Sequence, residues 1–360
     1  MRSDCEFQVL SANLNERLFR ERTPLSGGIE LTNTCNFRCI HCYEAMERDG
    51  NGKAMSTKRL IEIIDELIQM GVVSVFLTGG ESMLRPDFDY IYSYLRKHGV
   101  LVEILSNGST ITEEKCQIFK RYMPRMIDIS LYGATEETYR NVTGRTGAFQ
   151  DVLEGIDRLK RYGIPFQLKT VLLSANQHEL EGMRKIAQQY NVPFKFFTSI
   201  RPCNDGNTDP VSYMLSEQEI LDLESQDLAM LQYYEDKKRT KVLRELSERQ
   251  TENCTYLCRI AKNSFFISYD GILNGCVRSR RHGFDLKKGT FSDGWEYLFH
   301  TFVTPTKKAP FSCSQCQIMN YCDFCPGEFE IETGDPTVAP KAICNLAHKR
   351  YEKFGVPENV

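Results

Sequence analysis

The cysteines of this chain fall into two groups, and their spacing limits what the chain can fold into. The first group is Cys35, Cys39 and Cys42, and the second comprises eight of the 14 cysteines, between positions 254 and 344. Three thiols are one fewer than the four that saturate an iron-sulfur cube, whereas eight thiols are two complete sets. The counts therefore predict one cluster with an open iron and two closed clusters.

The charge balance and the N-terminal sequence limit the partners and the compartment. Lys and Arg number 45 against 48 Asp and Glu, with a net charge of -3 and no block of one sign. This balance offers no broad attraction for nucleic acid or anionic lipid. The chain shows no apolar signal core and no window near the roughly 20 apolar residues that cross a bilayer. We therefore expect a cytoplasmic protein without nucleic-acid or membrane partners, in which clustered cysteines bind metal or react rather than form disulfides.

The segment from Ile29 to about Thr198 alternates short apolar runs with helical patterns, which is typical of a parallel sheet wrapped by helices. A helix is expected after Ser56, which suits an N-cap. Six such units favour an α/β fold, a partial (βα)6 TIM-like barrel that is open along one side and carries its reactive loops at the carboxyl ends of the strands. The expected strands are Ile29–Leu31, Val73–Leu77, Leu101–Ser106, Met126–Leu131, Phe166–Val171 and Phe194–Thr198.

The sequence changes character after Pro202. Ser216 and Glu219 form a capping-box pattern that opens one long helical stretch, charge-dense from position 235 to 249. A hairpin is expected at Asp270-Gly271, because this dipeptide suits a two-residue turn. The cysteine-rich tail cannot bury enough apolar surface alone, so bound metal would hold it together. The expected parts are an N-terminal extension (1–24), the barrel (25–210), a helical bridge (211–252) and a cysteine-rich iron-sulfur domain (253–360).

The first cysteine group stands in LTNTCNFRCIHCY, directly after the first expected strand and hence at the mouth of the barrel. Thiolates at this spacing can each bind one iron of a cubane and leave the fourth iron free. A zinc site with His41 as the fourth ligand is the alternative. It is disfavoured because His41 stands between two ligands, where the coordination geometry is poor.

The spacing and place of these three cysteines resemble the radical SAM superfamily, and three further strand ends agree with it. TGGE ends the second strand, SNG ends the third, and Ser130 ends the fourth. The resemblance implies that Gly79, Gly80 and Glu81 hold the amino group of S-adenosylmethionine, and that Ser106, Asn107 and Ser130 meet its ribose or methionyl part. It also implies that Arg140, or equally Arg145, binds the methionyl carboxylate, and that His41 lies beside the cluster and adenine.

The same resemblance implies a mechanism and its cofactors. An electron from the reduced cluster cleaves S-adenosylmethionine, and the resulting 5'-deoxyadenosyl radical abstracts hydrogen from an unactivated carbon. The expected cofactors are S-adenosylmethionine, one [4Fe-4S] cluster that binds it and two auxiliary [4Fe-4S] clusters. A reducing partner such as flavodoxin or ferredoxin is expected to supply the electron.

The second cysteine group resembles the SPASM extension of radical SAM enzymes that modify peptides and proteins. The resemblance covers roughly residues 254 to 344, with two residues between Cys322 and Cys325 where the family usually has three. Two zinc ribbons are the alternative, because CxxC pairs also bind zinc. By the resemblance, one auxiliary cluster is held by Cys254, Cys258, Cys276 and Cys325, and the other by Cys313, Cys316, Cys322 and Cys344.

Several functions are compatible with this resemblance. The leading hypothesis is oxidative modification of a peptide or protein, a thioether or carbon–carbon cross-link in a ribosomal peptide, with the auxiliary clusters accepting electrons. The second is redox-neutral epimerisation of a peptide, with Cys203 on the loop after the sixth strand as hydrogen donor. Sulfatase maturation is a third, disfavoured because Val277 follows Cys276 where that pattern has an aspartate. A small-molecule or tetrapyrrole enzyme and a non-catalytic electron-transfer protein remain alternatives.

Two further expectations concern the chain outside the clusters. The 34 residues before Cys35 are too few for a leader-binding domain, so a separate protein or the barrel surface would recognise a leader peptide. Cys116 lies in a helical pattern and is expected to be a packing residue.

Overall fold

The computed structural model describes residue 17 and residues 20–44, 54–236, 255–303 and 311–355. In this part the chain forms one nine-stranded sheet, in the order β6-β5-β4-β3-β2-β1-β7-β8-β9. Neighbouring strands from β6 to β1 are parallel, which confirms the predicted partial barrel. The six barrel strands are β1 (Ser26–Glu30), β2 (Ser74–Thr78), β3 (Leu101–Ser106), β4 (Met126–Ser130), β5 (Phe166–Val171) and β6 (Phe194–Phe197).

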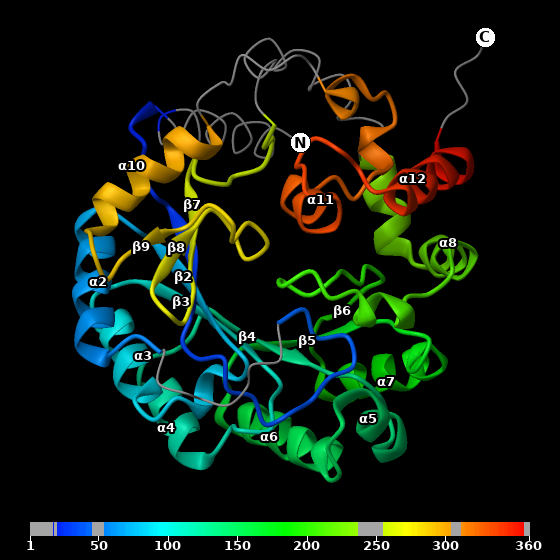
Figure 1. The fold of residues 1–360 in the computed structure, drawn as a ribbon. Helices are drawn as coiled ribbons and strands as arrows, with labels where there is room; N and C mark the ends of the chain where they lie inside the picture. Colours follow the sequence, from blue (N-terminus) through cyan, green and yellow to red (C-terminus); the bar gives the residue numbers. More distant parts are fainter. Residues whose placement is uncertain (1–16, 18–19, 45–53, 237–254, 304–310, 356–360) are drawn as a thin grey trace, which may run out of the picture.

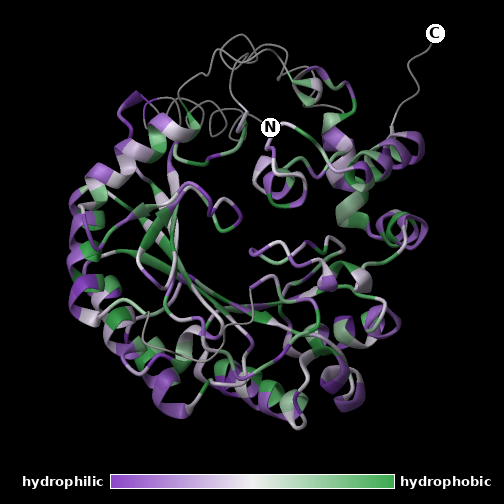
Figure 2. Ribbon diagram, in the orientation of Figure 1, coloured by the Kyte–Doolittle hydropathy of each residue, from purple (hydrophilic) through white to green (hydrophobic). Residues whose placement is uncertain are grey.

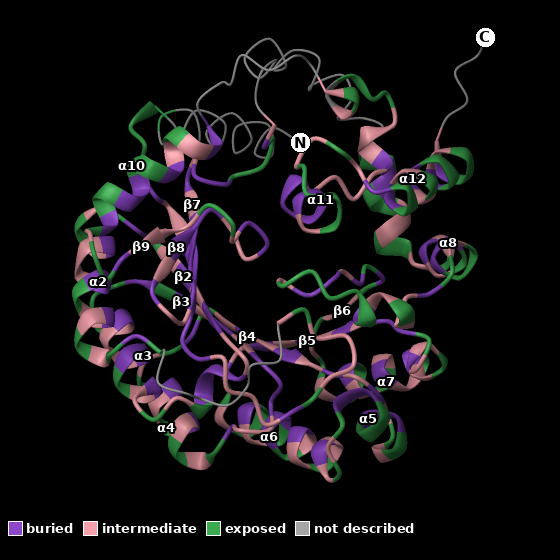
Figure 3. Cartoon of the chain, in the orientation of Figure 1, coloured by how far each residue is buried: buried purple, intermediate pink, exposed green. Residues whose placement is uncertain are grey.

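Helices cover the outer side of this curved sheet (Figure 1). In α2, Ser56 accepts a hydrogen bond from the Arg59 N–H, as the N-cap prediction requires, and Leu60, Ile63 and Ile64 form part of the buried face. Apolar and buried residues gather on the sheet side of the helices (Figures 2 and 3). The helices of the barrel are α2 (Thr57–Gln69), α3 (Phe88–Lys97), α4 (Glu113–Arg121), α5 (Glu136–Thr143), α6 (Ala148–Tyr162) and α7 (Leu180–Tyr190).

The C-terminal hairpin extends the barrel sheet, which the sequence did not predict. Strand β7 (Ser264–Ile267) runs parallel to β1, and β8 (Ile272–Asn274) and β9 (Phe284–Asp285) follow antiparallel. The turn lies one position earlier than expected, because the Gly271 N–H donates to the Ser268 carbonyl at 2.9 Å. Gly271 therefore follows the turn instead of forming its centre, and its φ of 87° suits glycine.

The predicted helical bridge begins as expected but is not continuous. Ser216 and Glu219 form the capping box of α8 (Glu217–Gln226). The helix ends at Asp227, whose Oδ1 accepts hydrogen bonds from the N–H groups of Ala229 and Met230 and starts a second helix at 228. Most of the charge-dense stretch, from 237 to 249, lies outside the described residues.

Three helices complete the C-terminal part, and α11 and α12 lie across the open side of the curved sheet (Figure 1). They are α10 (Phe291–Phe302), α11 (Pro326–Thr333) and α12 (Lys341–Phe354). Helix α12 is joined to α8 by an ion pair of 2.6 Å between Arg350 and Glu224, both buried. Among the helices described, none combines the length and apolar composition needed to cross a bilayer.

Candidate active site

A cavity of about 350 Å³ opens at the carboxyl ends of the barrel strands. Cys35, Cys39 and Cys42 all line it. The structure thus brings most of the predicted site residues of the barrel to one cavity. The predicted residues that also line it are His41, Gly79, Gly80, Ser106, Asn107 and Ser130.

The two glycines of TGGE allow the cysteine loop to lie directly against the end of β2. The Gly80 N–H donates to the Thr32 carbonyl and the Glu81 N–H to the Thr34 carbonyl, both at 2.8 Å. A Cβ atom at Gly79 would stand 2.3 Å from the Thr32 oxygen, and one at Gly80 would stand 2.3 Å from the Thr34 oxygen. Because a Cβ cannot approach so closely, only glycine permits this contact.

The other side of the cysteine loop is held by the end of α5. The Arg38 N–H donates to the Thr143 carbonyl at 2.7 Å, and the Ile40 N–H donates to the Val142 carbonyl at 3.0 Å. Phe37, between Cys35 and Cys39, is 1% exposed and packs edge-on against Tyr139. The loop that carries the three thiols is therefore fixed by the barrel itself.

Glu81 does not line the cavity but lies behind it, fully buried. Its carboxylate accepts hydrogen bonds from the Asn107 N–H at 2.7 Å and from the Ser106 hydroxyl at 3.1 Å. Asn107 in turn donates to the side chain of Asn36 in the cysteine loop at 2.8 Å. Burial raises the pKa of Glu81, although these donors oppose the rise. In this structure Glu81 joins the SNG turn to the cysteine loop, and its predicted contact with S-adenosylmethionine stays a prediction.

His41 presents an unsatisfied ring nitrogen beside the cavity. Its Nδ1 is buried without a hydrogen-bond partner among the described residues, and its ring meets that of Tyr132 at a centroid distance of 4.7 Å. Burial lowers the pKa of His41 to about 4, so the imidazole is neutral near pH 7. A neutral ring with a free polar atom fits a polar ligand in this cavity.

The arginines predicted to bind a carboxylate lie elsewhere. Arg140 is exposed on α5, and Arg145 pairs with Asp151 beside the Phe37 ring; neither lines the cavity. The cations that do line it are Lys169, Arg201 and Arg278, which the sequence analysis missed. Lys169 could have been found from its place on β5. It stands two residues before Val171, the last residue of that strand, and alternate residues of a strand share one face.

Cys203 lies beside the cysteine loop but not among the cavity residues. Its side chain is buried, and its thiol donates to the Cys42 carbonyl at 3.3 Å. Burial raises the pKa of the Cys203 thiol. The thiol therefore contacts the backbone of the cluster loop in this structure, and its role as a hydrogen donor stays a prediction.

The C-terminal cysteines form two separate neighbourhoods. Cys313, Cys316, Cys322 and Cys344 line a second, apolar cavity of about 40 Å³. Burial, together with the nearby thiols of Cys325 and Cys258, raises the pKa of Cys276 to about 12. The predicted ligand partition stays a prediction, and one of its members, Cys254, lies outside the described residues. Within the described ranges, no three or more His, Cys, Asp or Glu side chains are placed to hold a single metal ion.

Cys116, expected to be a packing residue, is fully buried in α4. It lies within the main apolar core of the barrel. Burial raises the pKa of its thiol to about 11. These observations agree with a packing role.

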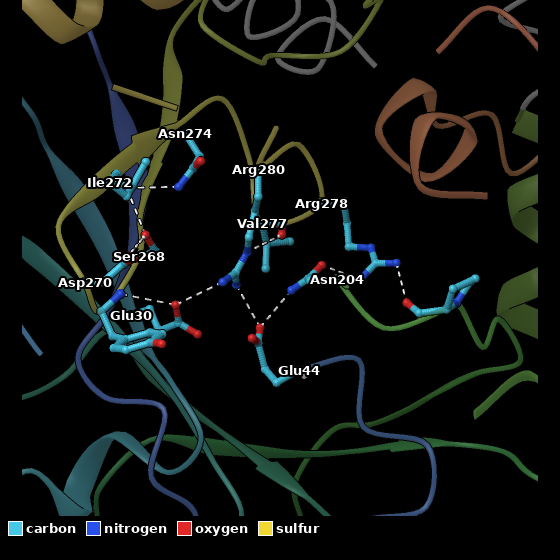
Figure 4. Close-up of polar contacts among 12 residues, drawn as sticks. Glu30, Glu44, Asn204, Ser268, Asp270, Ile272, Asn274, Val277, Arg278 and Arg280 are labelled. Atoms are coloured by element: carbon cyan, nitrogen blue, oxygen red, sulfur yellow. Dashed lines mark hydrogen bonds and ion pairs between the residues drawn. The ribbon is translucent and has the colours of Figure 1, made fainter. Parts of the chain in front are cut away.

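A polar network lies between the cysteine loop and the loop that follows Cys276 (Figure 4). Arg280 donates to Glu44 at 2.8 Å and to Glu30 at 3.3 Å, and Asn204 also donates to Glu44. Burial, together with repulsion from Glu44, raises the pKa of Glu30 to about 7. Arg278, whose guanidinium donates to Asn204, extends the network to α11.

Comparisons with known proteins agree with this geometry. Residues 29–187 match the Radical SAM superfamily. An AdoMet-dependent heme synthase from Methanosarcina barkeri is 30% identical over 51% of this chain and 53% of its own length. The subtilosin biosynthesis protein AlbA from Bacillus subtilis is 29% identical over 60% of this chain and 50% of its own length. The chain thus spans about half the length of these curated relatives.

One solved structure resembles nearly the whole fold. Native anSMEcpe with bound AdoMet and Cp18Cys peptide superposes with a TM-score of 0.64 at 17% identity, over 93% of this chain and 97% of that chain. The similarity includes the C-terminal cysteine-rich region as well as the barrel. At this identity the resemblance concerns the fold alone.

Proposed function

We propose that this chain, whose residues 29–187 match the Radical SAM superfamily, cleaves S-adenosylmethionine reductively and oxidises a peptide or protein substrate. The product proposed is a thioether or carbon–carbon cross-link. The observation that carries the proposal is the single cavity that gathers the three thiols of the cysteine loop with the ends of β2, β3 and β4. When bound there, a [4Fe-4S] cluster would supply the electron for the cleavage.

The residues around the cavity suit this cofactor pair. Cys35, Cys39 and Cys42 would hold three irons, and their loop is hydrogen-bonded to the barrel on both sides. The backbone at Gly79 and Gly80 lines the cavity beside the cysteine loop, where a ligand can contact it. The hydroxyl of Ser130 and the amide of Asn107 offer hydrogen bonds to a polar nucleoside.

The cavity also suits a peptide chain. It opens at the carboxyl ends of the barrel strands, so a segment of a larger substrate can enter it from that end. Phe197, 52% exposed at the end of edge strand β6, lines the cavity and offers an apolar contact. The relative AlbA, named for biosynthesis of the bacteriocin subtilosin, supports a peptide as the substrate class.

The proposal is tested by 5'-deoxyadenosine formation after anaerobic reconstitution with iron and sulfide. Replacing Cys35, Cys39 and Cys42 together by alanine should abolish it, because no other described thiol lines this cavity. Cys116→Ala is the matched control: its thiol is buried in α4, outside all three predicted cluster sites, and this variant should keep the wild-type rate. Undiminished 5'-deoxyadenosine from the triple variant would contradict the proposal.

A second candidate is modification of a tetrapyrrole, and the match to an AdoMet-dependent heme synthase favours it. The two candidate functions can be distinguished by the substrate that the protein modifies. Incubation with iron coproporphyrin under reducing conditions, followed by mass spectrometry, should leave the porphyrin unchanged if the peptide proposal holds. Loss of carboxyl groups from the porphyrin would favour the second candidate instead.

A further inference from the structure

Arg278 is the central residue of the contact between the two cysteine-bearing halves of the chain. It stands two residues after Cys276, and its side chain is only 9% exposed. Its Nε and Nη2 donate to both carboxylate oxygens of Glu328 in α11, at 2.7 and 2.8 Å. Glu328 lies three residues after Cys325, so this ion pair joins the backbone segments of two predicted ligands of one auxiliary cluster.

The remaining donors of Arg278 reach the loop after β6. Nη1 donates to the Asn204 side chain and Nη2 to the Pro202 carbonyl, both at 2.6 Å. That loop is in turn bound to the first cysteine loop, because the Asn204 N–H donates to the Tyr43 carbonyl at 2.8 Å. The Asn204 side chain also donates to Glu44, two residues after Cys42, at 3.2 Å. One guanidinium thus connects the segment after Cys276 to the segment after Cys42 through a single intervening loop.

Both partners of the ion pair stand close in sequence to predicted cluster ligands. Arg278 follows Cys276 by two residues, and Glu328 follows Cys325 by three. Groups that orient ligand residues tune iron-sulfur clusters. Arg278 and Glu328 also line the cavity, so the ion pair forms part of its wall.

We propose that Arg278 is a positioning residue that fixes the Cys276–Cys325 cluster site against the loop of Cys35, Cys39 and Cys42, and so sets the distance between two iron-sulfur clusters. The inference rests on the proposed function, because it requires both clusters. A planar guanidinium with donors in three directions suits this task, and lysine could not replace it. Because electron transfer depends on separation, the ion pair would keep the auxiliary cluster within reach of a substrate in the cavity.

The test compares two double variants by electron paramagnetic resonance after reconstitution and reduction. Arg278→Met with Glu328→Met removes the ion pair without leaving an unpaired buried charge. Arg85→Met with Asp87→Met is the matched control. Like Arg278, Arg85 is 9% exposed, binds both oxygens of an acid and donates to two further oxygens, here the carbonyls of Leu31 and Met55. Arg85 contacts neither the segment after Cys276 nor α11.

The measured quantity is the broadening of one cluster signal by a neighbouring reduced cluster. The relevant signal is the one that shifts when S-adenosylmethionine is added. The Arg278/Glu328 variant should keep the wild-type iron and sulfide contents but lose the broadening, whereas the Arg85/Asp87 variant should retain it. Unchanged broadening in the first variant, or loss of its iron, would overturn the positioning role. A wild-type protein with iron for one cluster only would instead contradict the proposed function itself.

Discussion

The two cysteine-rich regions of this chain are built in different ways. The loop of Cys35, Cys39 and Cys42 is bonded on one side to the end of β2 and on the other to the end of α5, and Phe37 anchors it in the main apolar core. The tail from 311 to 355 holds its cysteines on short turns and two helices. Near its C-terminal helix, a separate apolar cluster has only four buried residues, Leu221, Tyr234, Tyr321 and Phe354.

From this difference we expect that the fold prepares the first site, whereas the tail needs bound metal in order to fold. Backbone hydrogen bonds and close glycine contacts join the first loop to β2 and α5. In the tail, burial raises the pKa of Cys322 to about 12, which disfavours the thiolate until metal binds. Metal binding and local folding are therefore expected to be coupled in the tail and independent in the barrel.

The largest effect should come from removing iron. In chelated protein, amide hydrogen exchange in residues 311–355 should accelerate by more than about a hundredfold, because metal binding supplies much of the folding free energy of such small regions. Amides of β3 and β4 should keep their protection, which hydrogen-exchange mass spectrometry can follow in the same sample. If amide hydrogen exchange accelerates equally in residues 311–355 and in β3 and β4, metal binding is not coupled to folding in the tail alone.

A smaller effect should come from Gly80→Ala, which attacks the prepared loop directly. The new Cβ would stand 2.3 Å from the Thr34 carbonyl oxygen, so the loop must shift, at an expected cost of about 1–3 kcal/mol in the free energy of unfolding. Urea unfolding followed by fluorescence of the single tryptophan, Trp295, buried on α10, measures this cost. The rate of 5'-deoxyadenosine formation should fall as well.

The control for this variant is Gly147→Ala, before α6. Gly147 has a φ of 77° but no atom within 4 Å of an added Cβ. Only backbone strain of about 1 kcal/mol is then expected, with no effect on 5'-deoxyadenosine formation. If Gly80→Ala and Gly147→Ala reduce the rate of 5'-deoxyadenosine formation equally, the close approach at Gly80 is not what holds the cysteine loop in place.

The smallest expected effect is a pH-dependent contribution of one barrel residue, Glu179, to the free energy of unfolding. Burial acts to raise the pKa of Glu179, but hydrogen bonds from Thr135 and Ala134 outweigh it and leave the pKa below its ordinary value of 4.5. The carboxylate thus stabilises the fold above pH 4.5, and this contribution is lost as the pH falls through the lowered pKa. Glu179→Gln should cost about 1 kcal/mol at neutral pH and little in acid.

Urea titrations at neutral pH and in acid measure this difference. Glu181→Gln is the control, since its side chain is 72% exposed and pairs only with Arg184 among the described residues. If the free energy of unfolding of Glu179→Gln depends on pH as strongly as that of the wild type, the Glu179 carboxylate does not make this contribution.

The sequence predicted the barrel well because its signals are local. Each barrel strand was an apolar run, and Ser56 and Ser216 capped the helices that were expected after them. The parallel pairing of β7 with β1 was missed, because Ser26 and its partner Ser264 are far apart in the chain and no local pattern links them. The break at Asp227 was missed because its side chain caps a new helix within an otherwise helical pattern.

The candidate site was predicted only where spacing carries chemistry. The three cysteines and the glycines of TGGE were found because their patterns are short and placed at strand ends. Glu44, Arg278 and Glu328 were missed, since each reaches the cavity from a loop or helix end that only the tertiary fold brings there. The closely spaced arginines after Cys276 were the one available signal for the polar network.

The parallel pairing of β7 with β1 has a practical consequence for any attempt to dissect this protein. If the chain were truncated after β6, β1 would become an edge strand, and the main-chain groups that it pairs with β7 would lose their partners. Such edges recruit other chains, so the isolated N-terminal half should aggregate. A usable fragment, or a chimera with another tail, must carry residues 264–267 along with the barrel.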